Sequence, residues 1–292
     1  MYSIITDTSA NLDCELLHKH NIISIPFSFY IDGNEQTCTD TVAFDGSAYY
    51  NAMRKGTKVT TSQVNPQRYI DYMLPILKDG RDILFVGMSS GISGSYCSAQ
   101  MAASQLIDEF PDRSIFLVDT LGASLGEGLL VLKAAECRDN GMGLKETADF
   151  LSVLRYSMCQ VFTVDDLKYL KTTGRLSNIM AIAGTILNIK PILKGNESGK
   201  IVCFSKVRGR KQSIKALAEQ YDAMVLHPEE QTVGIAHADC PEDAECLAEL
   251  ICKNNPPKEI MNVCYEPVTG SHVGPGTLAL FFFGNTEFRT QP

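Results

Sequence analysis

The chain has 292 residues, of which 45% are apolar and 21% charged, a composition typical of a globular protein that buries a large core and forms two domains. A net charge of -8 at pH 7, without a long cluster of lysine and arginine, argues against nucleic acid as a partner, because neutralising phosphates takes several clustered cations. No apolar run is long enough to cross a membrane and no basic leader precedes one, so we expect a cytoplasmic protein without a membrane span.

Strand-like and helical spacings alternate along the first half of the chain. Strands are predicted at residues 2–6, 22–30, 83–86 and 115–118. Helices are predicted at residues 12–20, 66–77, 96–107, 126–139 and 144–158. This alternation is typical of a parallel sheet that is covered by helices.

The order of elements changes near residue 159. Helices are predicted at 165–172, 177–187, 212–224 and 241–253, and strands at 190–193, 201–207, 233–237, 260–267 and 278–283. We therefore predict an α/β protein with an N-terminal parallel-sheet α/β/α domain at residues 1–158 and an α+β domain at residues 159–292. No low-complexity linker separates them, so we expect the ligand site at the domain junction.

Cysteine and histidine positions give no sign of disulfides or metal ligation. The ten cysteines are scattered between Cys14 and Cys264 without a Cys-x-x-Cys pair, so we expect reduced cysteines in the core. His18 and His20 lie two apart on a predicted helix and face different ways, and no His-Glu-x-x-His motif is present. We expect neither a metal nor a cofactor.

The segment ILFVGMSSGISGSY, residues 83–96, is the strongest indication of a ligand site. An apolar strand ends there in serines and glycines and then enters a helix. Glycines allow close backbone approach, serines supply donors, and the helix start offers unpaired N–H groups with a positive dipole end. This combination favours an anion or a carbonyl as the guest.

Three further segments can carry chemistry, each with a structural alternative. The hydroxyls of VTTSQVNP, residues 59–66, precede a helix and can also be N-caps. Arg175 follows a glycine between two predicted helices and can also be a surface charge. His272 lies in TGSHVGPG, expected to be a glycine-rich loop between two strands, and is the best histidine candidate for a site.

A serine hydrolase is the alternative reading of the serine loop. Residues 87–91 match the nucleophile elbow Gly-x-Ser-x-Gly at Ser89, with His272 as the base and Asp119 or Asp239 as the acid. The match is weak, because a true elbow turns directly into its helix and here further loop residues intervene. No phosphate-binding glycine motif for a nucleotide is present.

Taken together, these segments resemble the DegV family, bacterial fatty-acid-binding proteins that include the B subunit of fatty acid kinase. The resemblance spans almost the whole chain and depends on eight motifs in the family's order. They are ITDTSANL (5–12), TTSQVNP (60–66), MSSGISGSYCSA (88–99), VDTLGASLGEG (118–128), LKYLKTTGRLSN (167–178), LNIKPIL (187–193), KVRGRKQ (206–212) and HVGPGTLAL (272–280).

The resemblance implies a carrier that is not catalytic alone. It would enclose one long-chain fatty acid in an apolar pocket and present the carboxylate to a separate ATP-dependent kinase subunit, which forms acyl phosphate. Carboxylate ligands carried over from the family are Thr61, Ser62, Ser93, Gly94 and His272. Arg175 and Arg208 correspond to positions that face the phosphate or the kinase.

Overall fold

The computed structural model describes residues 2–177 and 188–290. The chain divides into two compact units: unit 1 comprises the residues up to Phe44 together with Thr60–Arg155, and unit 2 comprises Asp45–Val59 together with the residues from Tyr156 onward. The chain passes from unit 1 to unit 2 for the last time between Arg155 and Tyr156, close to the predicted boundary after residue 158. Residues 45–59, which the sequence assigned to the first domain, cluster with unit 2. The helix predicted at 177–187 lies, apart from Ser177, outside the described residues.

Unit 1 is built on a four-stranded parallel sheet, which confirms the architecture predicted from the alternation. The strand order is β2-β1-β6-β7, with β1 at Ser3–Asp7, β2 at Ile22–Ile25, β6 at Ile83–Gly87 and β7 at Ile115–Asp119. Each neighbouring pair is parallel. The carboxyl ends of all four strands therefore meet at one edge of the sheet, where α/β folds bind ligands.

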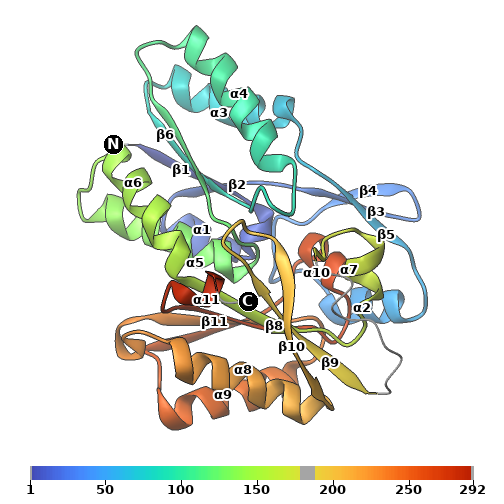
Figure 1. Ribbon diagram of the computed structural model, residues 1–292. Coiled ribbons are helices and arrows are strands. Elements are labelled where there is room, and N and C mark those ends of the chain that lie inside the picture. Colours follow the sequence, from blue (N-terminus) through green and yellow to red (C-terminus); the bar gives the residue numbers. More distant parts are fainter. Residues whose placement is uncertain (1, 178–187, 291–292) are drawn as a thin grey trace. The chain divides into compact units, whose positions relative to one another are not determined.

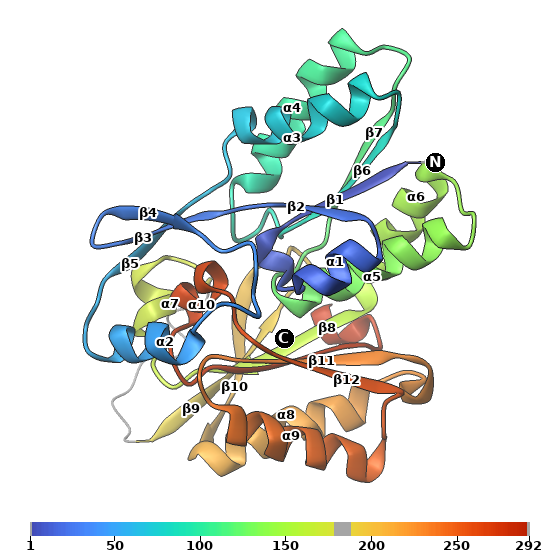
Figure 2. The same cartoon turned by 180° about the vertical axis from the view of Figure 1, so that it is seen from behind.

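Helices cover both faces of this sheet. Figures 1 and 2 show α3 (Pro66–Lys78) beside α4 (Ser95–Glu109) on one face, and α5 (Leu125–Asp139) with α6 (Leu144–Leu154) on the other. The start of α3 follows from its sequence: Asn65 accepts a hydrogen bond from Arg68 N at 2.9 Å, and Pro66 occupies the first helical position. Within the described ranges, no helix is long and apolar enough to cross a membrane.

The predicted strand at 22–30 is two strands instead of one. Pro26 follows β2, and β3 (Ser28–Ile31) starts a separate three-stranded sheet with β4 (Asn34–Thr37) and β5 (Val59–Ser62). Proline lacks the N–H that a sheet ladder needs, which explains the break. The hairpin between β3 and β4 turns at Asp32 and Gly33, both with positive φ.

Unit 2 has a six-stranded mixed sheet in the order β10-β9-β8-β13-β11-β12. Its strands are β8 (Met158–Thr163), β9 (Ile189–Gly195), β10 (Ile201–Arg208), β11 (Thr232–His237), β12 (Glu259–Cys264) and β13 (Leu278–Phe283). Only β11 and β12 pair in parallel. This arrangement is the α+β domain expected from the sequence.

Two helices, α8 (Arg210–Met224) and α9 (Pro241–Asn254), complete the apolar core of unit 2. Leu217, Tyr221 and Leu247 on these helices and Leu280 and Phe282 on β13 are all fully buried. The ring of Tyr221 meets that of Phe282 edge-on at 5.1 Å.

Helix α2 (Gly46–Arg54) belongs to unit 2 through specific contacts. Tyr50 Oη donates to the Tyr265 carbonyl and Tyr49 Oη to the Pro267 carbonyl, each at 2.8 Å. Arg54 also forms an ion pair with Asp239. These contacts explain why residues 45–59 pack with the second half of the chain although the residues on either side belong to unit 1.

Candidate ligand-binding site

The serine loop occupies the carboxyl edge of the parallel sheet, between β6 and α4. Carboxylates from the two strands beside β6 hold it. Asp119, at the end of β7, accepts from Ser90 Oγ at 2.5 Å and from Ser90 N at 3.3 Å. Asp7, at the end of β1, accepts from Met88 N at 3.4 Å. The loop is thus anchored at its start, while Ser93 and Gly94 lie beyond these anchors.

Ser93, Ser95 and the Val64 amide form a compact group of donors and acceptors, here called the hydroxyl cluster. Ser93 Oγ and Ser95 Oγ lie 3.0 Å apart, and Ser95 N donates to Ser93 Oγ at 3.2 Å. Val64 N donates to Ser95 Oγ at 3.1 Å. The structure therefore brings the segment before α3 against the start of α4, which joins two of the motifs singled out from the sequence.

Of the remaining predicted ligands of unit 1, Gly94 stands between Ser93 and Ser95 in the chain, and Thr61 and Ser62 stand three and two residues before Val64. Thr61 and Ser62 are half-buried in β5, whereas the neighbouring Thr60 is exposed. Gly94 lies against Gln63, whose Oε1 would stand 2.0 Å from a Cβ at this position. Gly94 provides no side-chain cap for α4, so the positive end of a 15-residue helix lies beside the hydroxyl cluster.

His272 and Arg175 lie close together in unit 2. His272 is in helix α10 (Pro267–Val273), not in the predicted loop. Burial, and then the charge of Arg175, lower the pKa of His272 to about 4. Burial also lowers the pKa of Arg175, whose guanidinium donates to the Thr173 carbonyl. At neutral pH the His272 imidazole is therefore uncharged, and the positive charge at this partly buried place is that of Arg175.

Two glycines that follow α10 allow the chain there to lie close to the segment that leads to Arg175. Gly274 has φ +83°, and a Cβ there would lie 2.2 Å from the Tyr169 ring of α7 (Lys168–Thr172). Gly276 has φ +78°, and a Cβ there would lie 2.3 Å from Asp165 Oδ2. Larger residues would force the segment after α10 away from the segment that leads to Arg175.

Arg208 lies away from this pair. It is exposed at the last position of β10, the edge strand of the six-stranded sheet. Leu176, next to Arg175, pairs with Ile201 at the first position of β10. The two arginines are thus separated by most of a strand, on the order of 20 Å at about 3.3 Å per residue. Arg208 and Arg175 therefore do not form one cluster.

Ser89 lacks the geometry of a nucleophile. It is fully buried, it is not among the residues with positive φ, and its Oγ accepts from Gly91 N at 3.1 Å. The two candidate acids are also engaged: Asp119 with Ser90 and Asp239 with Arg54.

The strained serine is Ser124, which the sequence reading passed over. It lies in Gly-Ala-Ser-Leu-Gly, residues 122–126, directly before α5, with φ 53° and ψ -140°. This is the backbone of an elbow, but Ser124 is 1% exposed. Ser124 stands before the first residue of α5, whereas His20 lies 3.8 Å from Asp139 at the last residue of this helix. A 15-residue helix is about 22 Å long, so His20 is too far from Ser124 to act as its general base.

A buried acid cluster, formed by Asp7, Ser9, Glu127 and Thr6, was also missed. Ser9 Oγ lies 2.5 Å from Asp7 Oδ1 and 2.6 Å from Glu127 Oε2, and Thr6 Oγ1 donates to Glu127 Oε1 at 3.0 Å. A hydroxyl has one proton, so Ser9 can donate to only one carboxylate. The other must itself be protonated to keep both contacts, and the pair therefore shares one proton.

The electrostatics agree with this proton count. Burial raises the pKa of Asp7 to about 6, although Ser9 opposes the shift. Burial, and then the charge of Asp7, raise the pKa of Glu127 well above its ordinary value. A fully buried acid pair cannot carry two charges at neutral pH.

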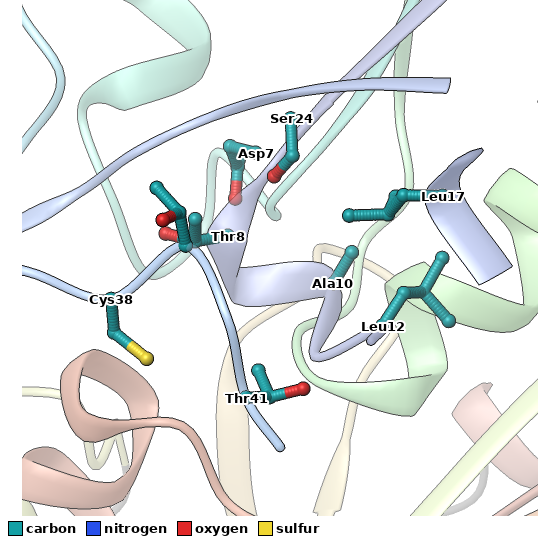
Figure 3. Close-up of a pocket in the computed structure, with 9 residues that line it drawn as sticks. Asp7, Thr8, Ala10, Leu12, Leu17, Ser24, Cys38 and Thr41 are labelled. Atoms are coloured by element: carbon teal, nitrogen blue, oxygen red, sulfur yellow. The ribbon is translucent and has the colours of Figure 1, made fainter. Parts of the chain in front are cut away.

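Asp7 also borders a small pocket (Figure 3). Figure 3 shows Asp7, Thr8, Ser24, Cys38 and Thr41 around one end, and the pocket is further lined by Ala10, Leu12, Leu17 and Thr39. Its cavity volume is about 10 Å³, room for no more than about one water molecule. This is far below the roughly 300 Å³ at which pockets for drug-sized ligands begin, and an ionisable carboxyl forms part of the wall. The pocket is therefore unsuited to a whole acyl chain.

Comparisons with known proteins agree with the fold and the motifs. The chain matches the family model described as "Uncharacterised protein, DegV family" over residues 1–285. A DegV domain-containing protein of Clostridium perfringens is 38% identical over 286 residues, which cover 98% of each chain. One of Streptococcus pyogenes is 32% identical over 98% of this chain and 99% of its own.

Solved structures show the same fold. A DegV family protein of Thermus thermophilus, described for its fatty acid binding, has a TM-score of 0.87 at 26% identity and covers 97% of this chain and 99% of its own. DegV of Bacillus subtilis, a fatty acid binding protein, has a TM-score of 0.81 at 27% identity, with 96% and 98% covered. With a family match over nearly its whole length and a relative at 38% identity, the chain belongs to the DegV family.

Proposed function

We propose that this protein binds a single long-chain fatty acid in an enclosed apolar pocket and presents its carboxylate to a separate ATP-dependent kinase subunit. The structural relatives from Thermus thermophilus and Bacillus subtilis are described as fatty acid binding, which supports the ligand class. The observation that carries the proposal is the hydroxyl cluster at the uncapped start of α4, at the carboxyl edge of the sheet.

Burying a fatty acid is favourable for its chain and unfavourable for its charged head group. Removing a C16 chain from water contributes on the order of 10 kcal/mol at about 0.8 kcal/mol per CH2. A buried carboxylate without donors would offset much of this gain or would protonate. The head group therefore needs convergent donors from a neutral or positive environment.

In our proposal these donors come from Thr61, Ser62, Ser93 and Gly94. The first three supply hydroxyls, and Gly94 supplies a backbone N–H beside the start of α4. Neutral donors suit the task because they pay no second desolvation cost for a charge. His272 is proposed as a further ligand, and its neutral imidazole at pH 7 can donate one N–H.

The two arginines are proposed to act after phosphoryl transfer, when the bound head group carries more negative charge. Acyl phosphate carries more negative charge than a carboxylate, so a bidentate guanidinium gains in value after phosphoryl transfer. Arg175, partly buried beside His272, is proposed to meet the phosphate. Arg208, exposed on the edge strand β10, is proposed to meet the kinase subunit.

The carboxylate site is tested by single substitutions in delipidated protein. We expect Ser93→Ala and Thr61→Ala each to weaken palmitate binding in calorimetry by about 5- to 150-fold, which is the effect of losing a hydrogen bond to a charged group. Thr60→Ala is the matched control, since Thr60 is exposed next to Thr61. Unchanged affinity in both test variants would overturn the site, and fluorophosphonate labelling lost in Ser89→Ala would favour a hydrolase instead.

The division of labour is tested by reconstitution with a fatty acid kinase catalytic subunit and ATP. Arg175→Ala and Arg208→Ala are expected to bind palmitate nearly as the wild type does, yet to give at least about tenfold less acyl phosphate. The protein alone with ATP and palmitate is expected to form none. Acyl phosphate made without the kinase subunit, or arginine variants that support normal turnover, would contradict the carrier role.

A further inference from the structure

The phenol of Tyr69 is buried without a hydrogen bond. Tyr69 lies on α3 with no exposed surface, and its ring packs edge-on against Phe85 at 5.3 Å. Across the part of the chain that the structure describes, Tyr69 Oη has no hydrogen-bond partner. A buried hydroxyl that stays unpaired costs stability, and a phenylalanine would fill the same space without that cost.

This phenol lies behind the hydroxyl cluster. Burial raises the pKa of Tyr69, the charges of Asp7 and Glu127 raise it further, and the nearby Ser95 hydroxyl partly offsets the rise. Tyr69 is therefore a phenol that keeps its proton, and it lies near Ser95, at the first position of the neighbouring helix α4. Ser95 in turn contacts Ser93 at 3.0 Å.

Counting protons in the cluster shows what a third donor would do. Ser95 Oγ already accepts from Val64 N, and Ser93 Oγ already accepts from Ser95 N. In the contact between the two hydroxyls, Ser93 Oγ donates to Ser95 Oγ, so the only hydroxyl proton of Ser93 is used inside the protein and both lone pairs of Ser95 Oγ are occupied. A bound anion would favour the reversed contact. If Ser95 donates to Ser93, the Ser93 proton is free for a ligand, and Ser95 has one lone pair left to accept a donor.

We propose that Tyr69 and Ser95 are positioning residues for a carboxylate bound at Ser93. In the bound state Tyr69 Oη donates to Ser95 Oγ, Ser95 Oγ donates to Ser93 Oγ, and Ser93 Oγ donates to the anion. Every hydroxyl dipole then points toward the carboxylate, and each bond strengthens the next. The inference rests on the proposed function and deepens it, because it explains how one half-buried serine discriminates an anion from a neutral head group.

The test is Tyr69→Phe, with affinity and stability measured separately on delipidated protein. Palmitate affinity in calorimetry is expected to fall by about 3- to 10-fold, whereas the melting temperature of the ligand-free variant is expected to stay equal or rise, because an unpaired buried hydroxyl has been removed. Affinity for hexadecanol, which has the same chain without the charge, is expected to remain unchanged. Tyr72→Phe, on the same helix, is the matched control.

A double variant separates this inference from the proposed function. In a Ser93→Ala background, Tyr69→Phe is expected to have no further effect on palmitate affinity, because the chain of donors is already cut. If Ser93→Ala weakens binding and Tyr69→Phe does not, the relay is wrong and the carboxylate site stands. A lower melting temperature for ligand-free Tyr69→Phe, or equal losses for palmitate and hexadecanol, shows a packing role and overturns the relay. If the wild type does not bind palmitate, both proposals fail.

Discussion

The acid cluster and the hydroxyl cluster both lie in unit 1, and they differ in whether carboxylates of the protein take up their hydroxyl groups. In the acid cluster they do, because Ser9 joins Asp7 and Glu127 and the pair holds a shared proton. The hydroxyl cluster contains no carboxylate, and Ser93 in it is only half-buried. Residue type alone would mark both clusters as sites. Ser9 is held by two carboxylates, whereas Ser93 donates only to another hydroxyl, and reversing that contact would release its proton for the proposed anion.

The difference also assigns a role to the acid cluster. One of its carboxylates, Asp7, accepts a hydrogen bond from Met88 N at the start of the serine loop. A full double negative charge at this edge of the sheet would repel the carboxylate of the proposed ligand, and the shared proton removes half of that charge. The acid cluster is thus a structural support whose shared proton limits its repulsion of an anion at the proposed site.

The largest expected effect is the dependence of unfolding free energy on pH. The pKa of Asp7 is raised to about 6 in the folded protein, so its contribution is present below pH 4 and is lost as pH rises through 6, by about 2 kcal/mol between pH 4 and pH 7. The pKa of Glu127 is raised well above its ordinary value, so the folded state keeps this second proton at neutral pH while the unfolded chain releases it, and the loss of stability is larger and continues to higher pH.

Urea unfolding of the wild type and Glu127→Gln at several pH values checks this effect. The glutamine keeps the shape without needing the proton, so its curve is expected to be flatter over the same range. Parallel curves for the two proteins would show that the pair shares no proton.

A pair of matched serine variants sharpens the contrast between the clusters. Ser9→Ala is expected to cost about 2 to 3 kcal/mol of unfolding free energy, because two buried carboxyl oxygens lose their common partner. Ser93→Ala is expected to cost less than about 1 kcal/mol, because its lost contacts are half-exposed. Ligand-free protein in urea gives both numbers. Equal losses would mean that the hydroxyl cluster is a structural element like the acid cluster.

His272 gives a pH effect of the opposite sign. Its pKa falls to about 4 in the folded protein, so between pH 4 and 6.5 the unfolded chain binds the extra proton and stability rises with pH. At pH 5 the cost is about 2 kcal/mol relative to pH 8. The wild type is expected to gain more than His272→Gln between these two pH values. An Arg175→Gln variant should recover part of the loss, since the arginine charge contributes to the shift.

Local sequence signals predicted the parallel sheet and the serine loop, because strand, glycine and helix follow one another within a few residues. They did not predict the acid cluster, since Asp7 and Glu127 are far apart in the chain and meet only after folding. They also missed α10, whose glycines suggested a loop. Gly270 is required there by contact, because a Cβ would lie 1.8 Å from Tyr50 Oη.

Two further differences have physical causes that no local pattern reveals. Residues 45–59 pack with unit 2 through tyrosine hydroxyls that bond to carbonyls more than 200 positions later in the chain. The strain at Ser124 is a backbone property, and its string Gly-Ala-Ser-Leu-Gly fits the same Gly-x-Ser-x-Gly pattern as the match at Ser89. Chemistry at a strand end is readable from sequence, whereas partners across the fold are not.

The most direct test of the account is native mass spectrometry of the protein as purified from bacteria. We predict about one bound species of fatty-acid mass per chain, and a lower melting temperature after delipidation that added palmitate restores, because a ligand that binds only the folded state stabilises it. The chain has no tryptophan, so melting is followed by calorimetry or a dye. A protein that is lipid-free as isolated, and whose melting temperature does not change with added fatty acids, would contradict the account.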